Sequence, residues 1–401
     1  MKAIEGGTVS TPQGFVAAGI HAGIKADGDL KDLALVLSDR VASAAAVYTA
    51  NQVQAAPIQV DREHLADNQA RGVILNSGNA NACTGRRGLE DARRMCGLAA
   101  QELDLAAEDI LVCSTGVIGV ELPMAVIEAA VADLAAAVTA DGGAAAAEAI
   151  MTTDTVPKSR AVEVELSQGT VRVGGMAKGA GMIAPNMATM LSVITTDAQV
   201  EAGFLRQVLS QAVKRSFNGI TVDGDMSTND TVIALANGAA GPQVVAGSAD
   251  AVAFGEAFEE VCRQLARMIA RDGEGATKLI TIRVTGAVNE ADGRQVGLAV
   301  ANSNLVKTAV FGRDPNWGRI LCAVGYAGVP IEPEQVRVSL CNTPIYAEGG
   351  GLAFDHGALV EAMGAADIPI EIDLAQGPAA AEIYTCDLSY DYVRINAEYT
   401  T

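Results

Sequence analysis

The sequence predicts an α/β or α+β fold, and two kinds of segment support that prediction. Short apolar groups alternate with small and polar residues over residues 16–24 and 33–48, a pattern typical of β-strands. Apolar residues recur on one face of residues 89–103, 204–217 and 252–270, as they do in amphipathic helices. Strand-like and helix-like segments are thus mixed along the chain, as this fold class requires.

The remaining elements follow from the same patterns and from turn residues between them. In the first half we expect a strand at 72–75 with an asparagine-rich turn at 76–81, a strand at 110–113 with a hydroxyl-rich loop at 114–119, helices at 123–138 and 143–151, and a hairpin formed by 160–166 and 170–173. In the second half we expect a strand at 190–194, the helices at 204–217 and 252–270, a strand at 279–285, a helix at 299–311, a structural loop at 312–319, and strands at 336–340, 370–374 and 381–392 that share a sheet.

Composition limits the classes of partner. The chain has 401 residues, of which 50% are hydrophobic, so it can bury a large core in one or two domains. Its formal net charge of −20 argues against nucleic acid or an anionic membrane as a partner, because both bind a concentrated positive field. An anionic substrate would therefore need a local cation of its own.

The cysteines and the start of the chain indicate a compartment. The seven cysteines form no Cys-x-x-Cys pair, so we expect buried thiols in a reducing environment and neither disulfides nor zinc ligands. Residues 1–10 lack the profile of a signal peptide, and no apolar run reaches about 18 residues. We expect a cytoplasmic protein.

Two aspartates raise the question of a metal. Asp223 and Asp225 stand two residues apart, as metal-binding carboxylates can. An EF-hand loop that begins at Asp223 needs a glycine and a glutamate where this sequence has Thr228 and Ala234. We therefore expect no metal, and a network of carboxylates and hydroxyls that holds a loop is the other interpretation.

The stretch from Lys178 to Asp197, KGAGMIAPNMATMLSVITTD, organises the rest of the sequence. Its glycines and Pro185 predict a tight loop that leads into an apolar strand and places Thr189 at the junction. If the peptide bond between Ala188 and Thr189 were cleaved, Thr189 would carry a free α-amine with a pKa of ~7.7–8.0 beside its own hydroxyl. Such an amine can serve as a general base. The alternative is a buried threonine that bonds to the backbone.

Three other positions can carry chemistry, and each also has a purely structural interpretation. The loop with Thr115 and Gly116 follows a strand, so it can direct N–H groups at an oxyanion, or it can be an ordinary turn. Glu274 stands between two glycines, where its carboxylate can meet an amine or only water. Lys178 can supply the local cation or be a solvated loop lysine.

The 178–197 stretch resembles the signature of the ornithine acetyltransferase (glutamate N-acetyltransferase) family of arginine biosynthesis. Members of this family cleave themselves before a threonine, which then becomes the nucleophile. The resemblance extends from Thr11 to the last residue, and residues 216–231 match a second family signature except that Met226 replaces a threonine. It implies an α/β sandwich with mixed sheets covered by helices, built from two autocleaved pieces, residues 1–188 and 189–401, which assemble as an α2β2 heterotetramer.

The resemblance also implies an activity and its residues. Thr189 would take the acetyl group of N-acetylornithine and pass it to glutamate by a ping-pong route through an acetyl-threonine, without a cofactor. Whether acetyl-CoA is a second donor stays open. Cleavage would fall between Ala188 and Thr189. The resemblance assigns the oxyanion hole to Thr115 and Gly116, and the substrate contacts to Thr152, Lys178, Thr189, Glu274, Asn396 and Thr401.

Other functions remain open. An autoprocessed amidohydrolase or aminopeptidase would use the same nucleophile with water as acceptor, and would release free acid. A non-catalytic amino-acid-binding protein would bind its ligand and stay uncut. A metal-dependent phosphotransferase ranks last, because the chain has no phosphate loop of the G-x-x-x-x-G-K-[ST] type.

Overall fold

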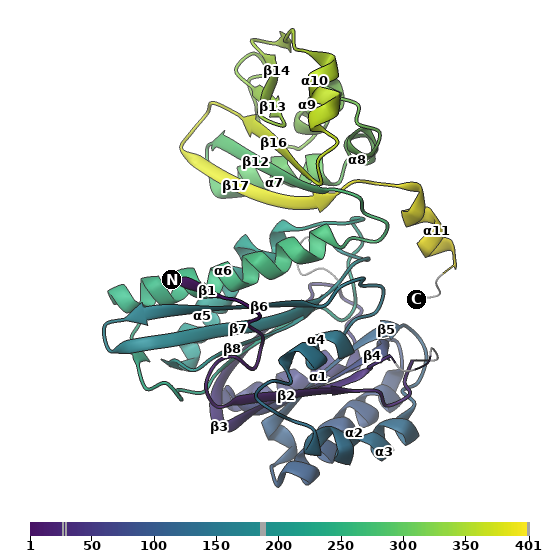
Figure 1. The fold of residues 1–401 in the computed structure, drawn as a ribbon, viewed down its shortest axis with the longest axis vertical. Helices are drawn as coiled ribbons and strands as arrows, with labels where there is room; N and C mark the ends of the chain where they lie inside the picture. Colours follow the sequence, from purple (N-terminus) through teal and green to yellow (C-terminus); the bar gives the residue numbers. More distant parts are fainter. Residues whose placement is uncertain (26–27, 29, 185–189, 399–401) are drawn as a thin grey trace.

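The computed structural model describes residues 1–25, 28, 30–184 and 190–398, in which helices and strands alternate along the chain (Figure 1). The strands are β1 (Lys2–Ile4), β2 (Phe15–Ile20), β3 (Leu33–Tyr48), β4 (Gln69–Asn79), β5 (Ile110–Val117), β6 (Lys158–Leu166), β7 (Gly169–Lys178), β8 (Leu191–Thr196), β9 (Gln199–Val200), β10 (Thr231–Ala236), β11 (Gln243–Val244), β12 (Leu279–Ala287), β13 (Arg337–Leu340), β14 (Thr343–Ala347), β15 (Gly350–Gly351), β16 (Asp367–Asp373) and β17 (Ala379–Cys386). The helices are α1 (Ala56–His64), α2 (Gly85–Leu103), α3 (Met124–Ala136), α4 (Gly143–Ala149), α5 (Ala202–Arg215), α6 (Ala249–Arg271), α7 (Glu290–Ala301), α8 (Asn304–Phe311), α9 (Trp317–Gly325), α10 (His356–Ala362) and α11 (Tyr390–Glu398).

One mixed sheet forms the larger part of the molecule. Among the described residues it has nine strands in the order β1-β6-β7-β8-β10-β3-β4-β5, with β2 also paired to β3. The long strand β3 joins two halves of this sheet. Its first residues pair with β2 and β4, and its last residues, 43–48, pair with β10. Because the ladder between β3 and β4 is interrupted between Leu37 and Ala42, the strand can turn from one half of the sheet into the other.

The two halves stack into a sandwich with helices outside. A buried apolar cluster between them combines side chains of β3, β4 and β5 with those of β7, β8 and β10. The outer face of the β6–β10 half is covered by α5 and α6, and that of the β2–β5 half by α1, α2 and α3 (Figure 1). This arrangement confirms the predicted α/β class with mixed sheets and helical layers.

A second sheet lies beyond α6 at one end of the molecule (Figure 1). Its strand order is β15-β14-β13-β16-β12-β17, and α7, α8, α9 and α10 contribute to its own apolar core. The predicted strands at 336–340 and 370–374 and the first part of the one at 381–392 share this sheet, as expected, and the predicted strand at 279–285 also belongs to it. No helix in the described part of the chain is both long and apolar enough to cross a membrane.

Several predicted elements are correct and a few are wrong. The strand at 33–48, the hairpin at 160–173 and the helix at 252–270 are confirmed. The predicted helix at 299–311 is instead two helices, because the Ser303 side chain accepts a hydrogen bond from Val306 N and begins α8. The predicted strand at 381–392 ends at Cys386, and α11 begins at Tyr390.

The segments near the predicted loops also differ in length. Strand β5 continues through Thr115 and Gly116, where we expected a loop, because it keeps a parallel ladder with β4. Likewise β4 continues to Asn79 through the predicted asparagine-rich turn. The side chains of Asn76, Asn79 and Asn81 donate to backbone carbonyls of nearby segments, so they hold the backbone together.

The α6 helix provides a test of the layered core. Phe258 is 0% exposed, so Phe258→Ala should lower the free energy of unfolding by about 3–5 kcal/mol. Val252 lies on the same helix but is 62% exposed, and Val252→Ala should change stability by less than about 0.5 kcal/mol. Equilibrium urea unfolding of both variants measures the difference, and similar losses would contradict the assignment of the buried face.

Candidate active site

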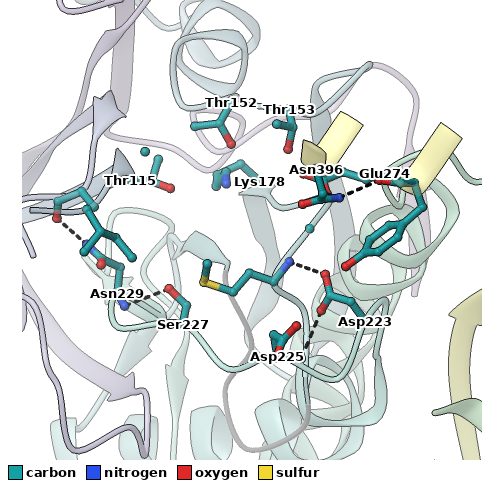
Figure 2. A pocket seen from close by; sticks show the side chains of 16 residues that line it. Thr115, Thr152, Thr153, Lys178, Asp223, Asp225, Ser227, Asn229, Glu274 and Asn396 are labelled. Atoms are coloured by element: carbon teal, nitrogen blue, oxygen red, sulfur yellow. Dashed lines mark hydrogen bonds between the residues drawn. The ribbon is translucent and has the colours of Figure 1, made fainter. Parts of the chain in front are cut away.

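A cavity of about 120 Å³, open to solvent, lies where the ends of β4, β5 and β7 meet the segments before β10 and after α6. Figure 2 shows Thr115 and Asn229 on one side, Glu274 and Asn396 on the other, and Lys178 between them. Hydroxyls, one ammonium and carboxylates thus face the same space. Because the cavity is open to solvent and polar groups line it, a small polar molecule can reach these groups.

The backbone at the end of β5 requires a glycine. Gly116 has φ of 133°, in the region that favours glycine. A Cβ at this position would lie 2.3 Å from the carbonyl carbon of Gly78 and 2.5 Å from Asn79 N. Close packing against β4 therefore fixes Gly116, and the preceding residue, Thr115, lines the cavity (Figure 2).

Lys178 ends β7 and is 2% exposed, so its ammonium needs compensation. Its Nζ lies 4.0 Å from Asp154 Oδ2. The same carboxylate accepts hydrogen bonds from Gly179 N (2.7 Å) and Thr152 N (3.0 Å). Asp154 therefore places Lys178 and Thr152 on one wall of the cavity.

The burial of these groups changes their acidity. Burial lowers the pKa of Lys178, and the attraction of Asp154 opposes only part of that effect. Burial alone would raise the pKa of Asp154, but the charges of Lys178 and Lys158 together with hydrogen bonds from Lys158 and Gly179 lower it to about 2. Asp154 is therefore ionised at neutral pH.

A second lysine completes this charge network behind the cavity wall. Lys158 is 0% exposed, and its Nζ donates to Asp154 Oδ1 and to Asp272 Oδ2, both at 2.6 Å. Asp272 also accepts from Thr155 N at 3.0 Å. These bonds connect the start of β6 to Asp272, which directly follows α6 and stands two residues before Glu274.

Glu274 occupies the opposite side of the cavity and is 8% exposed. Its N–H donates to Ala180 O (2.8 Å), and its carboxylate accepts from Asn396 Nδ2 (2.8 Å) on α11. A Cβ on Gly181 would lie 2.3 Å from this carboxylate, so only glycine at 181 leaves room for it. The second glycine of the Gly-x-Gly in the 178–197 stretch therefore leaves space for the Glu274 side chain.

Asp223 holds the loop that follows Lys178. Its carboxylate accepts from Met182 N (2.6 Å) and Ile183 N (2.9 Å), while burial raises its pKa. This agrees with the second interpretation of the aspartate pair, a network that supports a loop. Among the described residues, no group of three or more His, Cys, Asp or Glu side chains is placed to hold a metal ion.

The first described residue after the central loop is fixed by Asp230. Met190 N donates to Asp230 Oδ1 (3.0 Å), and Met190 O accepts from Thr231 N (3.1 Å). Burial raises the pKa of Asp230 well above its usual range. The start of β8 is thus bound to the start of β10.

Six of the predicted site residues line this one cavity: Thr115, Gly116, Thr152, Lys178, Glu274 and Asn396. Ala188, Thr189 and Thr401 lie outside the described residues. Sequence reasoning did not assign site roles to other lining residues, namely Thr153, Ser227, Asn229 and Tyr392. Thr153 directly follows the predicted site residue Thr152, and Ser227 lies within the family signature at 216–231. Tyr392 fell in a predicted strand.

Fold and site together define an α/β-sandwich protein with a polar cavity that is open to solvent, in which hydroxyl, ammonium and carboxylate groups face each other. A model of the ArgJ family matches residues 16–401. The arginine biosynthesis bifunctional protein ArgJ of Symbiobacterium thermophilum is 51% identical over 397 residues, which cover 98% of this chain and 99% of that protein.

Two solved structures are also similar. The crystal structure of the arginine biosynthesis bifunctional protein from Bacillus halodurans is 40% identical with a TM-score of 0.50, and the match covers 51% of this chain and 97% of that chain. The structure of ornithine acetyltransferase complexed with ornithine from Mycobacterium tuberculosis is 43% identical with a TM-score of 0.43, and the match covers 46% of this chain and 97% of that chain. The chain belongs to the ArgJ family. This confirms the predicted family and the predicted enzyme class, an acyltransferase of arginine biosynthesis.

The charge network predicts a pH dependence of stability. The pKa of Asp154 is about 2 in the folded protein against 3.8 for a free side chain, so its contribution is full above about pH 4 and is lost as pH falls towards 2. The stability advantage of the wild type over Asp154→Asn should shrink by about 2 kcal/mol across this interval. Urea unfolding at several pH values measures it. Asp133→Asn, on the exposed face of α3, should leave the profile parallel to the wild type, and a constant advantage for Asp154 would contradict the prediction.

Proposed function

We propose that this chain transfers an acetyl group from N-acetylornithine to glutamate through an acetyl ester on Thr189. The observation that carries the proposal is that Thr115, Gly116, Lys178 and Glu274 line one cavity that is open to solvent. The Thr115 hydroxyl stands on one side of it, and the Glu274 carboxylate stands on the other (Figure 2). Family membership supports the same reaction.

The first half-reaction forms the acetyl ester. Thr189 Oγ attacks the acetyl carbonyl while the Thr189 α-amine accepts the hydroxyl proton. The Thr115 hydroxyl and Gly116 N–H stabilise the negative charge that develops on the acetyl oxygen. When the C–N bond breaks, the α-nitrogen of ornithine takes the proton and leaves, and the acetyl group remains on Thr189.

The second half-reaction reverses these steps with glutamate. The α-amine of glutamate attacks the ester carbonyl, and the Thr189 amine again moves the proton. Thr189 Oγ departs as a hydroxyl and N-acetylglutamate is released. Thr189 can also take the acetyl group from acetyl-CoA, with the thiol of CoA as the leaving group. This would give the second activity of a bifunctional enzyme.

Both substrates carry an α-carboxylate, and the cavity has one buried ammonium for it. Lys178 provides a positive charge in a protein whose formal net charge is −20. Thr152 lies on the same wall and can donate to the carboxylate. Glu274 and Asn396 face the side chain, where the carboxylate of Glu274 pairs with the second ammonium of ornithine; Thr401 is a further proposed substrate contact.

The proposed free amine requires cleavage between Ala188 and Thr189, into residues 1–188 and 189–401. Arrangement of the sheet supports this division, since the chain before and after the loop provides adjacent strands, β7 and β8. The Bacillus halodurans chain is about half the length of this one, as one product of such a cleavage would be. Two copies of each piece would form the α2β2 assembly.

The thiols support a reducing location. All seven cysteines are free, and four of them are buried. We place the reaction in the cytoplasm for this reason.

Two other functions differ in what they release. An autoprocessed amidohydrolase or aminopeptidase would transfer the acyl group to water and produce free acetate from N-acetylornithine. A binding protein would release nothing. Product analysis with and without glutamate separates these functions from acetyl transfer.

Cleavage is tested by denaturing mass analysis of the wild type and Thr189→Ala. The wild type should give two fragments, residues 1–188 and 189–401, because its hydroxyl can attack the preceding carbonyl. The variant should stay intact, since alanine has no nucleophile. A folded wild type that remains whole would remove the proposed base and exclude the acetyl-threonine route.

The role of Glu274 is tested by Glu274→Gln. Loss of one charge-assisted pair should raise KM for N-acetylornithine about tenfold or more, because such bonds contribute roughly 1.5–3 kcal/mol. KM for glutamate should not rise, because its side-chain carboxylate forms no ion pair with Glu274 and faces one like charge fewer in the variant. Glu332→Gln, at an exposed position outside the cavity, is the control, and equal effects on both substrates would refute the assignment.

A further inference from the structure

Asn229 lines the cavity but has no part in the reaction described above. Its side chain is nearly buried, and its Nδ2 donates to two backbone oxygens, Ala80 O at 2.6 Å and Ser114 O at 2.8 Å. Its Oδ1 accepts from Thr228 Oγ1 at 2.6 Å. Both amide hydrogens are therefore committed to the backbone, and none is free for a substrate.

One of these carbonyls, Ser114 O, belongs to β5, which carries the proposed oxyanion hole, and the other, Ala80 O, directly follows the neighbouring strand β4. Ser114 O is part of the peptide group that joins Ser114 to Thr115. Because a peptide group is planar, a hydrogen bond to its oxygen also fixes the orientation of Thr115 N–H and the position of Thr115 Cα. On the other side of Thr115, Gly116 packs against Gly78 and Asn79, the residues just before Ala80.

Asn229 thus connects β5 and the end of β4 to a third segment. The ladder between β4 and β5 alone is irregular here, with register shifts around Asn79. Because the regular ladder is disrupted here, the bonds from Asn229 add a constraint that the ladder itself does not supply.

We propose that Asn229 is a positioning residue that aims the Thr115 hydroxyl and the Gly116 N–H at the acetyl oxygen. This inference rests on the proposed function. Loss of one oxyanion donor costs ~10²–10³-fold in kcat, and a misplacement of about 1 Å costs ~10²-fold. Removal of the amide should therefore lower kcat by about 10²-fold and leave KM nearly unchanged.

Two variants and a matched control test the proposal. Asn229→Ala removes the amide, and Asn229→Asp keeps an acceptor for Thr228 while it removes both donors. The control is Asn237→Ala at the other end of β10, whose Nδ2 donates to Gln13 O at 3.0 Å and Ser38 Oγ at 3.3 Å, and which is 7% exposed. Rates with N-acetylornithine and glutamate are expressed per mole of cleaved chain, from denaturing mass analysis, and Tm is measured for each protein.

The proposal requires that both Asn229 variants lose about 10²-fold in kcat while KM stays within about threefold. Asn237→Ala should keep its kcat at a comparable loss of Tm. If Asn229→Ala does not fold, Asn229→Asp decides. Unchanged kcat in a folded Asn229 variant would overturn the proposal. A folded variant that stays uncut, or a loss of kcat that is explained by the loss of Tm alone, would also overturn it. So would failure of Asn229→Asp to fold. A wild type that transfers no acetyl group would instead refute the proposed function.

Discussion

One buried carboxylate, that of Asp154, stabilises the wall of the cavity that carries the Lys178 ammonium. It accepts from Lys158 Nζ, Gly179 N and Thr152 N, and it lies 4.0 Å from the Nζ of Lys178. A buried ammonium without such a partner would lose its proton or move out to solvent, because burial already lowers the pKa of Lys178. With Asp272 as the second carboxylate, two lysines face two aspartates, and the network is neutral as a whole.

The segment from Lys178 to Ile183 uses this anchor to organise both sides of the cavity. Gly179 N binds Asp154, Ala180 O accepts from Glu274 N, and Met182 N and Ile183 N bind Asp223. The missing side chain of Gly181 makes room for the Glu274 carboxylate. Ammonium and carboxylate walls are thus both attached to one short segment, the first through Lys178 itself and the second through the hydrogen bond between Glu274 N and Ala180 O, so the length of that segment limits their separation.

The sequence predicted those features whose signal is local. Residues 33–48 alternate and form β3, and the glycines near Lys178 mark a loop. Strand β10 was missed because all six of its residues are buried, so it shows no alternation. Residues that line the cavity were predicted where a motif carries them, as for Thr115 and Glu274. The partners that position them were missed, because Lys158 meets Asp272 across 114 residues and Asn229 meets Ala80 across 149. No local pattern encodes such pairs.

The strand order explains how a chain could be cut beside its own active site and remain one body. Strands β8 and β10, from residues 189–401, are parallel neighbours at the centre of the large sheet. On one side β8 pairs with β7, and on the other β10 pairs with β3, both from residues 1–188. All residues of β8 and β10 are buried. Separation of the two pieces would break two central ladders and expose both apolar faces, so a cut at 188–189 would free an amine without loosening the walls that must surround it.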